Sequence, residues 1–301
     1  MTAHHSRSSS PFSGYLQGLR SRPQAWRTIA AVVGGLLVML VVLGGLAILA
    51  GMAVDRWIGV APFDPSRPTF TIGFWVAGNL LLALLIPASM LLQKLIYGAA
   101  WGTLSSVSGR FRWSVMARAA AVVVPVWGAY AAIIQPVLGT GQPVWSASHL
   151  LLGLVAVVTI PLQSAGEEYL FRGLIFRAVG ARFVRPVVAF LVATTITAVQ
   201  FGVIHGSADP WAVAYYIVIG ISFAVLAERT GGLEVPVLIH AVNNTLLLVP
   251  VILAGELASV STPSGPILIV PVLLVVTLTL VLWRITPWLQ ARVPRRTEAM
   301  T

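Results

Sequence analysis

Residues 149–170 read HLLLGLVAVVTIPLQSAGEEYL. Between the histidine and the two glutamates there is no Asp, Glu, Lys or Arg, and a transmembrane helix needs about 20 mostly apolar residues. This stretch is therefore long and apolar enough to cross a bilayer. Seven further stretches meet the same criterion, and together the candidates cover residues 28–54, 70–92, 119–138, 149–170, 187–205, 211–227, 235–254 and 267–288. The sequence predicts an all-α fold: a polytopic helical membrane protein of about eight transmembrane helices, with its polar site inside the bundle.

The composition of the 301 residues agrees with this fold class. Hydrophobic residues make up 57% and charged residues 9%, and the mean hydropathy is +0.90. A soluble domain carries about 25% charged residues, so an ordinary water-soluble protein is excluded. The net charge of +10 comes from basic residues that lie between apolar stretches. We therefore expect contact with the lipid bilayer and no nucleic acid partner. The absence of cysteine excludes disulfides and thiolate chemistry.

Basic residues alternate between successive loops. They occur in segments 1–27, 93–118, 172–185 and 284–296, whereas segments 139–148, 206–210 and 255–266 have none. Segment 55–69 has two Arg, which Asp55 and Asp64 offset. By the positive-inside rule, both termini are expected in the cytoplasm, and we place the chain in a bacterial plasma membrane. We expect a flexible cytoplasmic tail over residues 1–25, one helical membrane domain over 26–290 and a second cytoplasmic tail over 291–301. Residues 95–118 are expected to form an interfacial helix and loop.

Acidic residues are scarce, so their positions are informative. Seven of the nine are expected in loops or tails: Asp55, Asp64, Asp209, Glu228, Glu234, Glu256 and Glu298. Glu167 and Glu168 instead end a long apolar run. A charge at mid-bilayer costs at least about 2.5–3.5 kcal/mol, so such groups are functional candidates. Glu168 and Arg172 are four residues apart and can pair on one helix face. Glu167 is turned by about 100° and points to another surface.

Two further apolar segments carry polar residues at the same spacing. Phe201 precedes His205 by four residues, and His240 precedes Asn244 by four. Each pair shares a helix face. Taken singly, each pattern also fits a plainer structure, such as a histidine at a loop edge or a hydrogen bond between helices. The residue after His240 is Ala241, so this is not the HExxH helix of zinc hydrolases.

Taken in chain order, the three motifs resemble those of a known family. EExxxR (Glu167, Glu168, Arg172), FxxxH (Phe201, His205) and HxxxN (His240, Asn244) are similar to the motifs of the CPBP intramembrane proteases. That family includes type II CAAX prenyl endopeptidases and Abi bacteriocin-immunity proteins. The resemblance covers about residues 149–250. It implies an intramembrane endopeptidase that hydrolyses a peptide bond in a peptide or membrane-protein substrate, without a covalent intermediate.

The resemblance also implies catalytic roles for four residues. Glu167 would be the general base that takes a proton from water, His205 would help to hold that water, and His240 with Asn244 would stabilise the oxyanion. Support for these side chains would come from Glu168, Arg172 and Phe201. The favoured chemistry uses no cofactor. The alternative is a divalent metal ion, zinc by ligand type, held by Glu167, His205 and His240.

Two other functions remain open: a non-catalytic membrane immunity or scaffold protein, and a small transporter, since intramembrane Glu and His also form proton relays. The predicted spans also raise a geometric question. The 18 residues from Val187 to His205 make about 27 Å of helix, which puts His205 at the membrane face opposite Glu167 and His240. Either the helix that carries Glu167 continues to about Gly180 and places the glutamates deeper, or one segment is tilted, short or re-entrant.

Overall fold

The computed structural model describes residues 14–66, 69–259 and 264–291, and these residues form helices without a strand. The α-helices and the two π-helical segments are α1 (Ala25–Leu37), η2 (Val38–Leu43), α2 (Gly44–Trp57), α3 (Ile72–Ala83), α4 (Leu85–Tyr97), α5 (Trp113–Val137), α6 (Ala147–Glu168), η4 (Tyr169–Ile175), α7 (Phe176–Gly180), α8 (Pro186–Ile204), α9 (Pro210–Thr230), α10 (Glu234–Leu253), α11 (Ile269–Arg284) and α12 (Thr286–Gln290). Short 3-10 turns are η1 (Leu16–Leu19), η3 (Trp101–Leu104), η5 (Leu257–Ser259) and η6 (Pro266–Leu268).

Eight helical stretches in the described part of the chain are long and apolar enough to cross a membrane, which confirms the predicted fold class. Each overlaps one predicted span. Capping residues explain several boundaries: Ser146 accepts a hydrogen bond from the backbone N–H of His149, and Asp209 accepts one from Trp211. Pro186 and Pro210 begin α8 and α9, where the missing N–H of proline costs nothing. Residues 95–118 are expected not to cross the membrane. Of these, residues 98–112 lie between two of the candidate spans, and the rest belong to the ends of those spans.

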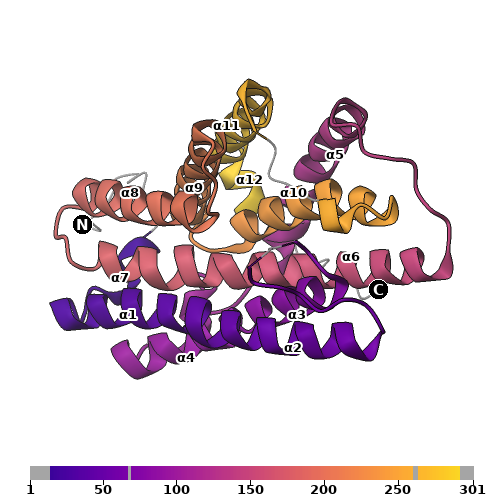
Figure 1. The fold of residues 1–301 in the computed structure, drawn as a ribbon. Helices are drawn as coiled ribbons and strands as arrows, with labels where there is room; N and C mark the ends of the chain where they lie inside the picture. Colours follow the sequence, from indigo (N-terminus) through magenta and orange to yellow (C-terminus); the bar gives the residue numbers. More distant parts are fainter. Residues whose placement is uncertain (1–13, 67–68, 260–263, 292–301) are drawn as a thin grey trace, which may run out of the picture.

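The longest stretch is the unbroken helix formed by α6, η4 and α7 (Figure 1). It runs from Ala147 to Gly180 between α1–α4 on one side and α5 with α8–α12 on the other. Gly166 permits the close approach on the first side, because a Cβ at this position would overlap the carbonyl oxygen of Leu82 at the end of α3. This helix therefore forms the centre of the bundle.

The long helix answers the question of depth raised by the sequence. It continues to Gly180, the first of the two predicted alternatives, and α8 packs back along it after the turn at 181–185. Glu167 then lies about 20 Å of helix before that turn, and His205 lies about 28 Å after it. The two motif residues are therefore at comparable depth.

Three acidic residues expected in loops are buried instead. Asp55, Glu228 and Glu234 expose 0%, 3% and 0% of their surface. Burial of a carboxylate requires compensating donors, and each of the three has them. Asp55, inside α2, accepts hydrogen bonds from the Thr71 hydroxyl at 2.6 Å and from the backbone N–H of Gly73 at 2.7 Å. It thereby ties α2 to the start of α3.

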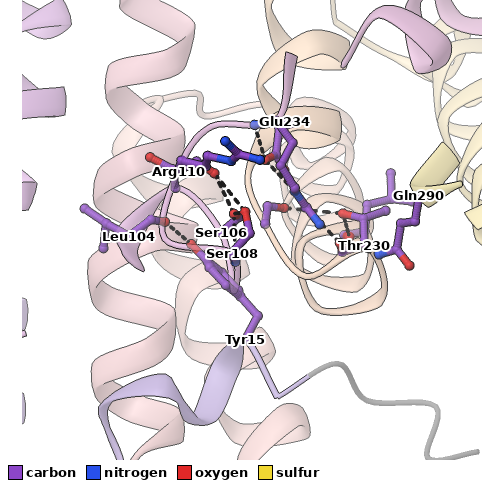
Figure 2. Close-up of polar contacts among 12 residues, drawn as sticks. Tyr15, Leu104, Ser106, Ser108, Arg110, Thr230, Glu234 and Gln290 are labelled. Carbon is purple, nitrogen blue, oxygen red and sulfur yellow. Dashed lines mark hydrogen bonds and ion pairs between the residues drawn. The ribbon is translucent and has the colours of Figure 1, made fainter. Parts of the chain in front are cut away.

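Glu234 helps to hold one end of the bundle together (Figure 2). Both carboxylate oxygens of Glu234 accept from Arg112, at 2.8 and 2.7 Å, and Arg112 also donates to the Thr230 carbonyl at 2.9 Å. The Gln290 side chain donates to the same carbonyl at 2.7 Å. The segments before α5, after α9 and after α11 are thus joined at one end.

The N-terminal segment also packs at this end. Residues 1–13 and 292–301, both predicted as tail, lie outside the described residues. Residues 14–25 differ from the predicted flexible tail, because Tyr15, Leu16 and Leu19 are buried. Glu228 accepts from the backbone N–H of Gly14 and of Leu16, and the Tyr15 hydroxyl donates to the Leu104 carbonyl. Burial raises the pKa of the Tyr15 phenol, so it stays a neutral donor.

Candidate active site

Glu168 is the centre of a buried charged cluster where α6 passes into η4. Its Oε1 accepts from Arg172 Nη1 at 3.0 Å and from His240 Nδ1 at 2.8 Å. The side chains of Glu168 and Arg172 have no exposed surface. The predicted ion pair therefore forms, and it includes a third partner from α10. A π-helical turn directly after the glutamates is typical of functional sites in helices.

Arg172 is enclosed by aromatic rings. Its guanidinium carbon lies 4.3 Å from the ring centroid of Phe201 and 5.4 Å from that of Phe223. Such cation–π contacts stabilise a cation that has left water. Gly220 on α9 makes room for the group, since a Cβ there would lie 3.3 Å from Arg172 Nη2 and 2.8 Å from the Cα of Ala198. Phe201 thus contributes its ring to the arginine as well as to the histidine one turn later.

Glu167 is turned away from this ion pair, as the helical period predicts. Its Oε1 accepts a short hydrogen bond from Gln163 Nε2, one turn earlier on α6. Its Oε2 lies 3.8 Å from His240 Nε2, and the side chain keeps 15% of its surface exposed. One carboxylate oxygen is therefore held, and the other faces an imidazole nitrogen.

The contact with Glu168 sets the orientation of His240. An ionised carboxylate can only accept, so Nδ1 of His240 carries the proton in this hydrogen bond. In the neutral imidazole, Nε2 is then an acceptor that faces Glu167. An oxyanion needs a hydrogen-bond donor, so His240 could stabilise an oxyanion through Nε2 only when Nε2 is protonated as well. The adjacent Glu168 carboxylate would balance that charge.

His205 directly follows α8 and lies beside the same phenyl ring as His240. The ring centroid of Phe201 is 4.6 Å from that of His205 and 5.8 Å from that of His240. Nδ1 of His205 bonds the Phe201 carbonyl at 2.6 Å, which leaves Nε2 as the acceptor. Burial lowers the pKa of His205, and the nearby Glu167 charge opposes the shift. The motif residues of α6, α8 and α10 are thus brought together.

Asn244 on α10 faces α6. Its Nδ2 donates to the Ser164 hydroxyl at 3.4 Å, and its Oδ1 accepts from Asn243 Nδ2 at 2.9 Å. An amide with its oxygen already bonded presents its N–H groups to the remaining space, so Asn244 can act as a donor next to Ser164.

A bound metal ion would require its three expected ligands to lie close together. By residue type, Glu167, His205 and His240 suit zinc, and both imidazoles leave Nε2 available. Within the described ranges, however, no three His, Cys, Asp or Glu side chains gather closely enough to hold a metal ion. The arrangement does not fit a three-ligand site, so no catalytic step is derived through a metal.

Sequence analysis missed several residues that contact the site. Gln163 precedes Glu167 by four residues, so the spacing rule applied to the other pairs would have found it. Tyr216 on α9 stacks on His205, with ring centroids 3.7 Å apart and an interplanar angle of 18°. No motif spacing signals Tyr216, because it comes from another helix.

Comparison with known proteins finds a family similar to the segment that carries this site. Residues 146–246 match the family model described as type II CAAX prenyl endopeptidase Rce1-like. This region belongs to the CPBP family. The match includes every motif residue of the site. At the family level, the CPBP region is CAAX-protease-like, and the chain is an integral, multi-pass membrane protein.

One curated relative is similar over part of the chain. It is the uncharacterized protein YyaK of Bacillus subtilis (strain 168), 30% identical over 122 residues, which are 38% of this chain. The match spans 39% of the length of YyaK. No solved structure matches the chain significantly. The family similarity therefore concerns the helices that carry the site.

Proposed function

We propose that this protein is an intramembrane endopeptidase that hydrolyses a peptide bond of a peptide or membrane-associated protein. The observation that carries the proposal is the approach of Glu167 Oε2 and His240 Nε2 to 3.8 Å, with Glu168 fixing the imidazole from behind. A water molecule at Glu167 Oε2 would donate one proton to that oxygen, and its second proton would be available to an imidazole Nε2. The match of this region to the CAAX endopeptidase family supports the same activity.

The proposed reaction uses Glu167 as general base. Glu167 takes a proton from water as the water oxygen bonds to the scissile carbonyl carbon, and the carbonyl electron pair moves onto its oxygen. Asn244 Nδ2 donates to this oxyanion, and His205 Nε2 accepts from the attacking water. The intermediate then collapses, the C–N bond breaks, and the amine nitrogen receives the proton held by Glu167. One positioned oxyanion donor is worth about 10²–10³ in rate.

The proposed setting is a bacterial plasma membrane with both termini in the cytoplasm. The supporting observation is that basic segments far apart in sequence meet at one end of the bundle. Arg112 bonds Glu234 and Thr230, Arg177 bonds the Tyr15 carbonyl at 3.1 Å, and Arg118 donates to the Leu289 carbonyl at 2.9 Å. Such an end suits the cytoplasmic face under the positive-inside rule.

The test is cleavage by purified protein in liposomes. The probe is a pool of internally quenched peptides, half of them with an S-farnesylcysteine followed by three C-terminal residues, so that a prenyl requirement is read in the same experiment. E167Q, H205A and H240A are each expected to abolish cleavage, whereas Glu256→Gln, whose carboxylate accepts from the Gly141 backbone away from the site, retains it. Full activity in all three site variants would refute the proposal.

Two controls separate the alternatives. Loss of cleavage on chelation, restored only by zinc, would favour the metal chemistry over the glutamate base. A scaffold or immunity protein predicts that the site variants keep the biological phenotype, and a carrier predicts substrate-dependent proton uptake into the same liposomes. Cleavage by wild-type protein with unchanged internal pH contradicts both.

A further inference from the structure

We infer that a one-directional hydrogen-bond chain, which starts at Trp127 on α5, positions both Asn244 and Glu167. The inference rests on the proposed function, because it assigns positioning residues to that site. These hydrogen bonds run from Trp127 through Asn243, Asn244, Ser164 and Gln163 to Glu167, and only Asn244 and Glu167 belong to the sequence motifs. This series of hydrogen bonds is the Trp127 chain.

The direction of the Trp127 chain is set at its first bond. Trp127 Nε1 lies 3.2 Å from Asn243 Oδ1, and an indole N–H can only donate. The amide of Asn243 therefore has its oxygen toward α5. The Tyr215 hydroxyl donates to the same oxygen at 3.4 Å, which reinforces this orientation. Trp127, Tyr215 and Asn243 are all buried, so no bulk water competes for these bonds.

Each later bond follows from the first. With its oxygen engaged, Asn243 turns its Nδ2 toward Asn244 and donates to Oδ1 at 2.9 Å. Asn244 must then present its own Nδ2 on the other side, where it donates to the Ser164 hydroxyl at 3.4 Å. Ser164 has one proton, and it donates to Gln163 Oε1 at 3.4 Å.

The Trp127 chain ends on the general base. Gln163, whose oxygen accepts from Ser164, has its Nε2 left to donate, and this nitrogen bonds Glu167 Oε1. A carboxylate accepts without donating, so the series of hydrogen bonds ends there. With Oε1 held by Gln163, Oε2 is the oxygen that faces His240.

The Trp127 chain therefore fixes the orientation of the Asn244 amide and of the Glu167 carboxylate. Asn244 has its N–H groups, and not its oxygen, directed to the side on which an oxyanion would form. Glu167 has one oxygen held and one free for the water. An amide is nearly symmetric in shape, so packing alone would not distinguish its two orientations. A donor-only indole does so, because the flipped Asn243 would put an N–H against another N–H.

The experiment measures kcat and KM in the liposome assay for variants of the Trp127 chain. Trp127→Phe removes the indole donor, Asn243→Leu removes the link to Asn244, and Gln163→Leu removes the donor to Glu167. We expect each to lower kcat about 10-fold with KM unchanged, as loss of supporting partners does at other sites. Trp127→Phe combined with Asn243→Leu is expected to be no slower than Asn243→Leu alone.

Matched controls separate positioning from packing. Trp75 on α3 is similarly buried but lies in another apolar cluster, and Tyr130 packs edge-on against Trp127 without joining the chain. Trp75→Phe and Tyr130→Phe are expected to keep kcat within twofold. If Trp127→Phe and Gln163→Leu also keep kcat within twofold while E167Q is inactive, the Trp127 chain is refuted and the proposed function stands.

A second measurement does not depend on cleavage. Glutamate labelled with ¹³C in its carboxyl group is introduced, and the infrared band of Glu167 is identified by subtraction of the E167Q spectrum. Gln163→Leu removes the donor to Oε1, so we expect a shifted carboxylate stretch, and no shift in Trp75→Phe. An unshifted band in Gln163→Leu would refute the Trp127 chain, whether or not the wild-type protein cleaves a peptide. The absence of cleavage by wild-type protein would refute the proposed function instead.

Discussion

Replacing Glu168 by glutamine should destabilise the protein strongly, and a second substitution should reverse most of the loss. The Glu168 and Arg172 side chains are both fully buried and are joined at 3.0 Å. E168Q keeps the size of the side chain and an acceptor for His240, but it leaves the guanidinium without a counter-ion among three aromatic rings. Removing one partner of a buried pair costs about 3–5 kcal/mol.

The double variant with Arg172→Met removes the orphaned charge as well. Replacing both ions by neutral side chains of similar volume is often neutral or stabilising, so the double variant should recover to within about 2 kcal/mol of wild type. The coupling free energy in this cycle is then about 3 kcal/mol or more, far above the ~0.6 kcal/mol of an average hydrogen bond between membrane helices.

The assay is reversible unfolding in mixed dodecylphosphocholine–SDS micelles, followed by far-ultraviolet circular dichroism. Glu256→Gln serves as the matched control, because Glu256 is only half-buried and is expected to cost about 1 kcal/mol or less. The reasoning is refuted if E168Q unfolds at the wild-type SDS fraction. It is equally refuted if the loss of unfolding free energy in the double variant equals the sum of the losses in the two single variants.

Three further substitutions test other contacts. Gly166→Ala should cost about 1–3 kcal/mol in the same unfolding assay, because the added methyl overlaps the Leu82 carbonyl, and unchanged stability would contradict this close approach. Asp55→Ala should cost about 1–3 kcal/mol for each buried donor left unpaired, and it should expose residues 58–66 to protease. Equal proteolysis rates in Asp55→Ala and wild type would argue against this tie between α2 and α3. Tyr216→Leu should lower kcat up to about 10-fold by removing the ring stacked on His205, whereas Tyr216→Phe should not, and equal rates for both would show that stacking is unimportant.

The sequence alone determined the membrane class, the approximate spans and the grouping of the motif residues. Apolar length is a property of each segment by itself, so it can be recognised without knowing the neighbours. The Glu168–Arg172 pair was likewise predictable, since four-residue spacing on a helix brings side chains together wherever that helix lies.

Tertiary structure decided what depends on contact between helices. Nothing local to Glu168 reveals that His240 is its third partner, and nothing local to Asn244 reveals that Trp127 sets its orientation. Asp55, Glu228 and Glu234 were misassigned to loops for the same reason. Burial of a carboxylate depends on donors from distant segments, and their positions are fixed only when the helices pack.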